Sequence, residues 1–340
     1  MNLNLIGNGF DLYHGLPSSY YYFGCYLIET DHEFFEEIGK IYNLTNKIMV
    51  EPYISHEYEH AVEDLFWSNF ESRLATVDEY FVVESSVDDL GLEIPDPVDL
   101  EINDDHNADV LKMKFCQWVI DTLDIDDNYE LIRRHLLINN YLHINADDYF
   151  LQFNYTHSLQ RLYDVNDEMI HYVHGECLRP DDELIIGHGN DIVIRELSEK
   201  IEKLNEEYDY TQASNNRIAE YRCVLEYVKK LRKNVKRCMV DCDNFYGKID
   251  ENIDCICLYG LSLGEVDVPY LVQIRDRWPE AKWRFSYYDK ADKKRIQKVA
   301  RNDLMLKDNE FSTFRLVNTD SRAICNEIVQ LRGIIEHERV

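Results

Sequence analysis

The chain has 340 residues, of which 45% are hydrophobic and 12% aromatic, and its formal net charge is −29. This composition is typical of a globular protein with a sizeable core and excludes a disordered chain. Because affinity for nucleic acid depends on neutralising phosphates, so acidic a chain argues against DNA or RNA binding over a broad face, although a local basic stripe could remain.

The nine cysteines are scattered and form no Cys-x-x-Cys pair, which argues against a zinc ribbon and a thioredoxin-type redox pair. We expect no metal, and a reducing cytoplasm fits this cysteine usage. The start of the chain lacks the basic and apolar parts of a signal peptide. The longest apolar stretch, Tyr20 to Ile28, is far shorter than the roughly 20 residues of a membrane helix. We therefore expect a cytoplasmic protein without a membrane partner.

In chain order, the first predicted elements are a strand, a glycine-rich turn and a helix. The apolar strand covers residues 2–6, Gly7-Asn8-Gly9-Phe10-Asp11 and Gly15-Leu16-Pro17 form the turn, and an aromatic-rich helix covers 19–30. Open α/β sheets hold phosphate with this order of parts, since glycine permits positive φ and a close approach of backbone to ligand. The glycines do not have the spacing of the usual dinucleotide fingerprint.

A helical insertion is predicted next. Apolar residues at helical spacing indicate helices over 57–82 and 110–137. The stretch 87–109 between them is acidic, contains Pro95 and Pro97 and lacks a periodic apolar face, so we interpret it as a surface loop. We assign 57–137 as a whole to this insertion.

The rest of the chain alternates between strands and helices, apart from a helical hairpin over 192–245 that we interpret as a second insertion. The alternation at both ends of the chain predicts one α/β domain over 1–340 with a doubly wound, mainly parallel, Rossmann-like sheet. In order, the predicted strands are 149–156, 169–173, 184–186, 253–259, 283–287 and 314–317, and the predicted helices are 157–163, 266–278, 290–301 and 321–332.

Polar residues directly after predicted strands are the candidates for chemistry, because ligands of open α/β sheets bind at the carboxyl ends of the strands. One such turn alone is most often only a turn, but several at one edge form a more specific pattern. The four segments are Gly7 to Asp11, Asn154-Tyr155-Thr156, His174-Gly175-Glu176 and Gly260-Leu261-Ser262-Leu263.

Together these segments resemble the sirtuin-like NAD-binding fold. Gly7, Gly9, Gly15 and Pro17 stand in the register of the sirtuin opening motif. Asn154 corresponds to the asparagine that ends a sirtuin strand, and His174-Gly175 to the catalytic His-Gly. The resemblance implies that Asn154 and His174 act on NAD, and that the residues binding it are Gly7, Asn8, Gly9, Phe10, Asp11, Gly15, Gly260, Ser262 and Leu263.

A closer resemblance is to the bacterial AbiH family, associated with abortive infection by phage. It implies a phage-defence effector with a nucleotide ligand and a phage-derived trigger or a partner defence protein, and it leaves a homo-oligomer open. The opening motif carries this resemblance together with Trp67 to Glu71 (Trp-x-x-x-Glu), Phe153-Asn154-Tyr155-Thr156, His171 to Gly175 (His-x-x-His-Gly) and Gly187-His188-Gly189.

The chain departs from sirtuins at three places. The zinc ribbon is missing between the His-Gly and the Gly260 segment, which disfavours deacylase activity. Asp11 replaces a small serine and adds a negative charge beside the expected phosphate cradle. Tyr155 and Thr156 follow Asn154, where sirtuins often have an acidic residue.

Cleavage of NAD still suits the remaining residues. Asn154 would position the ribose hydroxyls or a water, His174 would act as a base, and His188 would line the same cleft. Each residue also has a structural interpretation: His174 and His171 as satisfied histidines, Asn154 as a helix cap.

Three functions therefore stay open. The first is an NAD glycohydrolase. The second, favoured by Asp11, is a catalytically inactive nucleotide-binding sensor or interaction protein. The third is a metal-dependent nuclease or phosphotransferase with Asp11, His174, His188 and Asp191 as ligands, which the acidic charge disfavours.

Overall fold

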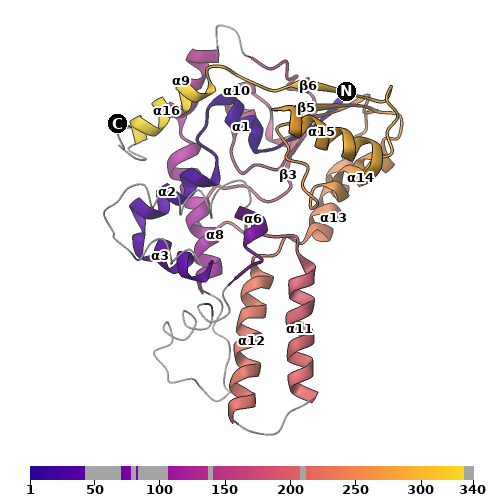
Figure 1. The fold of residues 1–340 in the computed structure, drawn as a ribbon. Helices are drawn as coiled ribbons and strands as arrows, with labels where there is room; N and C mark the ends of the chain where they lie inside the picture. Colours follow the sequence, from indigo (N-terminus) through magenta and orange to yellow (C-terminus); the bar gives the residue numbers. More distant parts are fainter. Residues whose placement is uncertain (43–69, 78–81, 83–105, 137–140, 207–211, 333–340) are drawn as a thin grey trace. The chain divides into compact units, whose positions relative to one another are not determined.

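The computed structural model describes residues 1–42, 70–77, 82, 106–136, 141–206 and 212–332 (Figure 1). The chain divides into two compact units. The first combines 1–19, 116–184 and 234–340, and the second combines 20–115 and 185–233. Each unit is thus assembled from segments that are far apart in the sequence.

A six-stranded, fully parallel sheet forms the centre of the first unit (Figure 1). From β1 the strands follow one another to β2 and β3 on one side, and β4, β5 and β6 then follow on the other side of β1. The strand order, not the strand direction, therefore reverses between β1 and β4. The predicted doubly wound, mainly parallel sheet is confirmed. In spatial order the strands are β3 (Ile170–Tyr172), β2 (Tyr149–Gln152), β1 (Asn2–Ile6), β4 (Cys255–Tyr259), β5 (Lys282–Tyr287) and β6 (Phe311–Arg315).

Helices cover both faces of this sheet. On one face, Phe10 of α1 (Asn8–His14) and Leu159 of α10 (Ser158–Tyr163) share a core cluster with Ile6. On the other face, the ring of Phe245 of α13 (Val235–Tyr246) stacks on the ring of His171, with 5.4 Å between the centroids, while Nε2 of His171 is buried without a hydrogen-bonding partner among the described residues. The remaining helices of this unit are α9 (Asp126–Leu136), α14 (Val268–Arg277), α15 (Lys290–Lys298) and α16 (Ser321–Arg332), with shorter turns at Val119–Leu123, Asp167–Met169 and Val299–Asp303.

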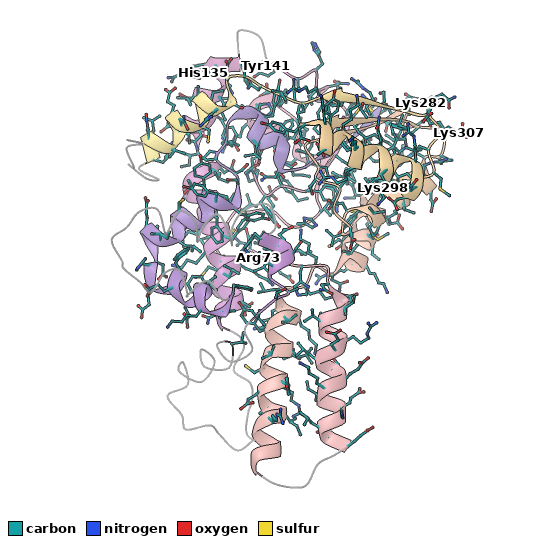
Figure 2. All side chains as sticks on the ribbon, in the orientation of Figure 1. Arg73, His135, Tyr141, Lys282, Lys298 and Lys307 are labelled. Atoms are coloured by element: carbon teal, nitrogen blue, oxygen red, sulfur yellow. The ribbon has the colours of Figure 1, made fainter. Side chains whose placement is uncertain are left out.

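Basic residues concentrate at the β5–β6 edge of the sheet. Helix α15 contains five lysines and arginines in nine residues, and Lys298 lies there with Lys282 of β5 and Lys307 close to β6 (Figure 2). All three are exposed. Helix α15 is therefore a locally basic segment of this acidic chain.

The second unit is helical in its described part. Contacts between aromatic rings join α2 to α6 and α8, and the ring centroids of Phe23 and Phe115 lie 5.2 Å apart. Helix α11 packs along α12. No helix in the described ranges is long and apolar enough to cross a bilayer. The helices are α2 (Tyr20–Thr30), α3 (His32–Ile41), α6 (Phe70–Arg73), α8 (His106–Trp118, which ends in the first unit), α11 (Asp191–Glu206) and α12 (Gln212–Lys230).

The expected insertions divide differently in the structure. Of the segment 192–245, α11 and α12 belong to the second unit, whereas α13 covers the sheet of the first. Asn234 separates them by accepting a hydrogen bond from the Arg237 amide as the cap of α13. The predicted helix 57–82 and the acidic loop 87–109 lie largely outside the described residues. The predicted helix 110–137 is two helices, α8 and α9, with a π-helical turn that ends before Asp124.

Three local expectations were wrong. The opening turn is mostly helix, since α1 begins at Asn8 directly after Gly7 and ends where Gly15 adopts a φ of 85°. The segment 184–186 forms no strand. The last strand begins at Phe311, three residues before the predicted 314–317, because Phe311 pairs with Trp283 of β5.

Candidate active site at the carboxyl edge of the sheet

Two glycine-containing segments contact each other where the strand order of the sheet reverses. Ile6 of β1 is in register with Tyr259 of β4, and directly beyond them the Gly9 amide donates to the Gly260 carbonyl at 2.9 Å. A Cβ on Gly7 would lie 2.6 Å from the Gly260 oxygen, and one on Gly9 would lie 2.7 Å from the Gly260 Cα. These glycines are therefore needed for the backbones of the two segments to touch.

Other residues of the opening motif have structural partners. The side-chain amide of Asn8 donates a hydrogen bond to the Ser18 backbone carbonyl at 3.0 Å and accepts one from the Ser18 hydroxyl at 2.7 Å. Phe10 is fully buried in the sheet core, and a Cβ on Gly15 would lie 2.7 Å from the Ile324 side chain. The structure thus gives Phe10 and Gly15 a packing role, and their predicted ligand contacts remain predictions.

Asp11 is buried and points toward the segment after β2. Its carboxylate accepts hydrogen bonds from the hydroxyls of Thr156 at 2.7 Å and Ser158 at 2.5 Å. Burial raises its pKa to about 6, although both hydroxyls act in the opposite direction. The carboxylate is therefore held by hydroxyls of the protein itself, directly after Asn154-Tyr155.

Asn154 also contacts the opening motif, since its side-chain amide donates a hydrogen bond to the Gly7 backbone carbonyl at 3.0 Å. His174 follows β3, and its ring lies 5.5 Å from that of Phe153 and 6.4 Å from those of Tyr155 and Tyr270. Only 5% of Asn154 and 4% of His174 are exposed. The structure brings both residues to the carboxyl edge of the sheet but packs them within the protein.

The Gly260 segment completes this edge. Ser262 is exposed, and its hydroxyl donates to Asp267 at 3.3 Å. Leu263 is buried with a φ of 55°, and the Gly264 amide donates to the same Asp267 oxygen at 2.9 Å. Ser262 is therefore the polar side chain that this loop presents to solvent.

His188 belongs to the second unit, where backbone groups occupy both ring nitrogens. Its Nδ1 accepts from the Asn190 amide at 3.1 Å and its Nε2 lies 3.0 Å from the Val228 carbonyl. Burial lowers its pKa, and Asp191 forms an ion pair with Arg232 at 2.6 Å. Within the described ranges no three His, Cys, Asp or Glu side chains form a group that could hold a metal ion.

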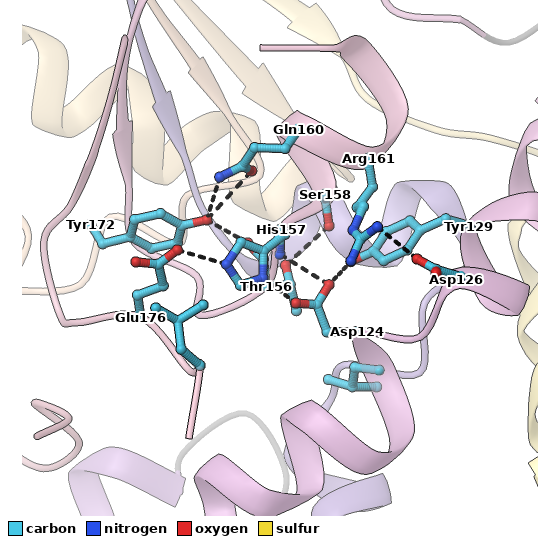
Figure 3. A network of polar contacts seen from close by, with 12 residues as sticks. Asp124, Asp126, Tyr129, Thr156, His157, Ser158, Gln160, Arg161, Tyr172 and Glu176 are labelled. Atoms are coloured by element: carbon cyan, nitrogen blue, oxygen red, sulfur yellow. Dashed lines mark hydrogen bonds and ion pairs between the residues drawn. The ribbon is translucent and has the colours of Figure 1, made fainter. Parts of the chain in front are cut away.

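A polar network that the sequence did not reveal centres on His157, the residue before α10 (Figure 3). Its Nδ1 bonds to the Asp124 carboxylate, and its Nε2 lies 2.6 Å from Oε1 of Glu176. Tyr129 donates to Asp124 at 2.7 Å. Burial lowers the pKa of His157, but the hydrogen bonds and charges of the two carboxylates outweigh it and raise that pKa. The imidazole thus lies between two carboxylates that favour its charged form.

Only part of this network has a signal in the sequence. His157 directly follows Asn154-Tyr155-Thr156, and Glu176 directly follows His174-Gly175, so both are next to candidate segments. Asp124 has no such neighbour. It lies 33 residues from His157, and only the fold brings the two together.

The comparisons with known proteins agree with the motifs. The family model described as Bacteriophage abortive infection AbiH matches residues 3–287. The chain belongs to the AbiH family. No curated protein and no solved structure matches it.

Membership in the AbiH family indicates a role in abortive infection by phage. The match runs from β1 to the last residue of β5, so it contains all of the candidate segments and leaves out β6 and α16. Two of the segments on which the resemblance was based contact each other directly, through Asn154 and Gly7 and through Thr156 and Asp11. The Trp-x-x-x-Glu motif is described only at its end, where Glu71 pairs with Lys233 at 2.8 Å.

Proposed function

We propose that this AbiH-family protein acts in abortive infection by binding NAD at the carboxyl edge of its sheet and hydrolysing the bond between nicotinamide and ribose. The observation that carries the proposal is the contact of Asn154 with Gly7 at the point where the strand order of the sheet reverses. Open α/β sheets bind nucleotides outside this point. Depletion of NAD would stop the metabolism on which phage replication depends.

The reaction places modest demands on the protein. Nicotinamide leaves as a neutral molecule, and the ribose passes through an oxocarbenium-like state, so the site must mainly orient the ribose and a water. Asn154 is held by a hydrogen bond to backbone and would orient the ribose hydroxyls. His174, on the adjacent strand end, is the base that we proposed from the sequence.

A second candidate is a nucleotide-binding sensor without catalytic activity. The specific observation in its favour is burial, because both Asn154 and His174 are almost inaccessible. A base that cannot reach a water or a substrate cannot accept its proton. The two candidates differ in turnover but share the binding of a nucleotide.

The first prediction tests Asn154. Asn154→Ala should lower the release of nicotinamide from NAD by about 10²-fold, the scale expected for a positioned catalytic group. The matched control is Asn4→Ala, since Asn4 is equally buried and donates to the Tyr149 carbonyl at 3.4 Å, but within β1 rather than beyond it. The control should keep wild-type turnover.

The assay uses the full chain with NAD, alone and with an extract of phage-infected cells to supply a trigger. Nicotinamide and ADP-ribose are the products to detect. Wild-type protein that binds NAD in both conditions but releases no nicotinamide would replace hydrolysis by the sensor function. Equal turnover by the wild type and Asn154→Ala would remove Asn154 from the site.

A further inference from the structure

One carboxylate oxygen of Glu176 is hydrogen-bonded to the protein, and the other can bind a water or a ligand. Its Oε1 lies 2.6 Å from Nε2 of His157, whereas Oε2 has no hydrogen-bonding partner among the described residues. The Glu176 side chain is 33% exposed. A carboxylate fixed at one oxygen and open at the other can accept a proton from a water or face a developing positive charge without first paying to be ordered.

The side chains that hold Glu176 are more buried the further they lie from it along the chain of hydrogen bonds. The exposed fraction falls from 33% at Glu176 to 15% at His157 and 7% at Asp124. Tyr129 and the His157 amide also donate to Asp124. The His157 imidazole is therefore oriented by a buried carboxylate and in turn orients the exposed one, as in hydrolytic triads where a buried carboxylate holds a histidine.

The network belongs to the same edge of the sheet as Asn154. His157 is three residues beyond Asn154, and Glu176 follows β3, the neighbour of β2. Between them, Tyr172 of β3 donates to the Thr156 carbonyl at 3.3 Å, and Gly175 reverses the chain with a φ of 92°. A Cβ there would lie 2.9 Å from the Glu183 carbonyl, so the turn directly before Glu176 requires glycine.

From this arrangement we infer that Glu176 is a catalytic carboxylate of the proposed hydrolysis, and that His157 and Asp124 are its positioning residues. The inference rests on the proposed function. Glu176, in place of the buried His174, would take a proton from the attacking water as the water oxygen bonds to C1′ of the ribose. The C1′–nitrogen bond breaks, and its electron pair neutralises the nicotinamide ring. The products are nicotinamide and ADP-ribose, and the proton passes from Glu176 to solvent.

The second prediction compares Glu176→Gln with Glu183→Gln in the full chain. Glu183 lies in the same loop region, is 84% exposed and pairs weakly with Arg237 at 3.7 Å, so it controls for the loss of one carboxylate. Glu176→Gln should lower nicotinamide release by about 10²-fold, because the amide cannot accept the proton. It should still bind NAD within about 3-fold of the wild type, as expected when an interaction made only in the transition state is removed. The Glu183 variant should match the wild type in both.

The variant His157→Gln tests whether His157 orients Glu176, and the measurement is the dependence of NAD turnover on pH. The imidazole faces Asp124, Glu176 and the ring of Tyr172, at 5.9 Å between centroids. Because these acids keep it charged above its ordinary range, wild-type turnover should fall as the pH rises and the imidazolium is lost. The Gln variant should be slower and lack this alkaline decline, which a purely structural role would not predict.

The outcomes separate the two proposals. A wild type that releases nicotinamide, with undiminished release by Glu176→Gln, overturns the role of Glu176 and leaves the proposed function standing. A wild type that binds NAD without releasing nicotinamide, with or without the infected-cell extract, overturns both. Loss of NAD binding together with turnover in Glu176→Gln assigns this residue to binding and also overturns the inference.

Discussion

Asp11 and His157 are neighbours in the fold, because Asp11 contacts Thr156 and Ser158 on either side of His157. Their pKa values are raised for different physical reasons. Asp11 is buried against hydroxyls, so desolvation dominates and its pKa rises to about 6. His157 lies between two carboxylates, so their hydrogen bonds and charges outweigh desolvation and favour its charged form. The neutral form of Asp11 and the cationic form of His157 are therefore both favoured by the fold, which has consequences for stability at different pH.

The third prediction concerns Asp11 and its effect on stability. Its carboxyl group has a higher pKa in the folded chain than its ordinary value of 3.8, so the folded state binds more protons between these values. Stability from this group is present at low pH and is lost as the pH rises through about 6. The free energy of unfolding of the wild type, minus that of Asp11→Asn, should fall by about 2 kcal/mol between about pH 4.5 and pH 7.5.

Denaturant unfolding at a series of pH values measures this difference. Asp308→Asn, which removes a carboxylate that is 80% exposed, controls for the change in net charge. Any constant cost of placing an amide beside Thr156 and Ser158 cancels, because only the pH dependence is compared. Parallel curves for the wild type and Asp11→Asn would show that Asp11 is ionised in the fold at the same pH as in the unfolded chain.

Among the elements, α1 depends on tertiary contact more than on its own sequence. It has seven residues and contains Gly9, and so short a helix with an internal glycine is unfavourable alone. The Gly9 amide bonds to the Gly260 carbonyl instead. This explains why the sequence suggested a turn up to Pro17, whereas the structure has a helix from Asn8.

The fourth prediction reverses a familiar rule for glycine in helices. Gly9→Ala should lower the free energy of unfolding by about 2 kcal/mol or more, because the added Cβ would lie 2.7 Å from the Gly260 Cα. In an open helix the same change would stabilise by roughly 1 kcal/mol. Gly247→Ala is the control, since its Cβ would meet nothing closer than 3.5 Å and its φ is −64°. That variant should be neutral or up to about 1 kcal/mol more stable.

Circular dichroism during denaturant unfolding gives both values. If Gly9→Ala is as stable as Gly247→Ala, the contact between the segments after β1 and β4 is not tight. The glycine would then remain available for the ligand contact that the sequence first suggested.

The sequence predicts the elements whose local pattern and burial agree. Strands β1, β2 and β4 are apolar runs followed by polar turns, so their place in a parallel sheet and the meeting of Gly7 with Asn154 could be inferred. Contacts between distant residues could not. Glu176 lies 19 residues from His157, and neither shares a periodic pattern with Asp124. Helix α13 was assigned to the hairpin because its helical period continues that of α12, although Asn234 already marks a new helix start.

At the scale of the whole molecule, net charge and local charge differ in sign. The chain carries −29, yet α15 has five basic residues in nine. Fields from exposed charges reach about 30 Å at 0.01 M salt but only about 8 Å at 0.15 M. An anionic nucleotide therefore meets the total charge at low salt and only its immediate surroundings at physiological salt.

The fifth prediction follows for the proposed nucleotide site. ADP-ribose is anionic and cannot lose nicotinamide, so its binding can be measured by calorimetry without turnover. Its affinity should rise several-fold as salt increases from about 20 to about 200 mM, because the repulsion from the acidic chain is screened. Adenosine, which is neutral, should bind with an affinity that salt leaves unchanged. A fall in ADP-ribose affinity with salt would contradict this prediction and would mean that lysines or arginines at the site, rather than the total charge, dominate the binding of the pyrophosphate.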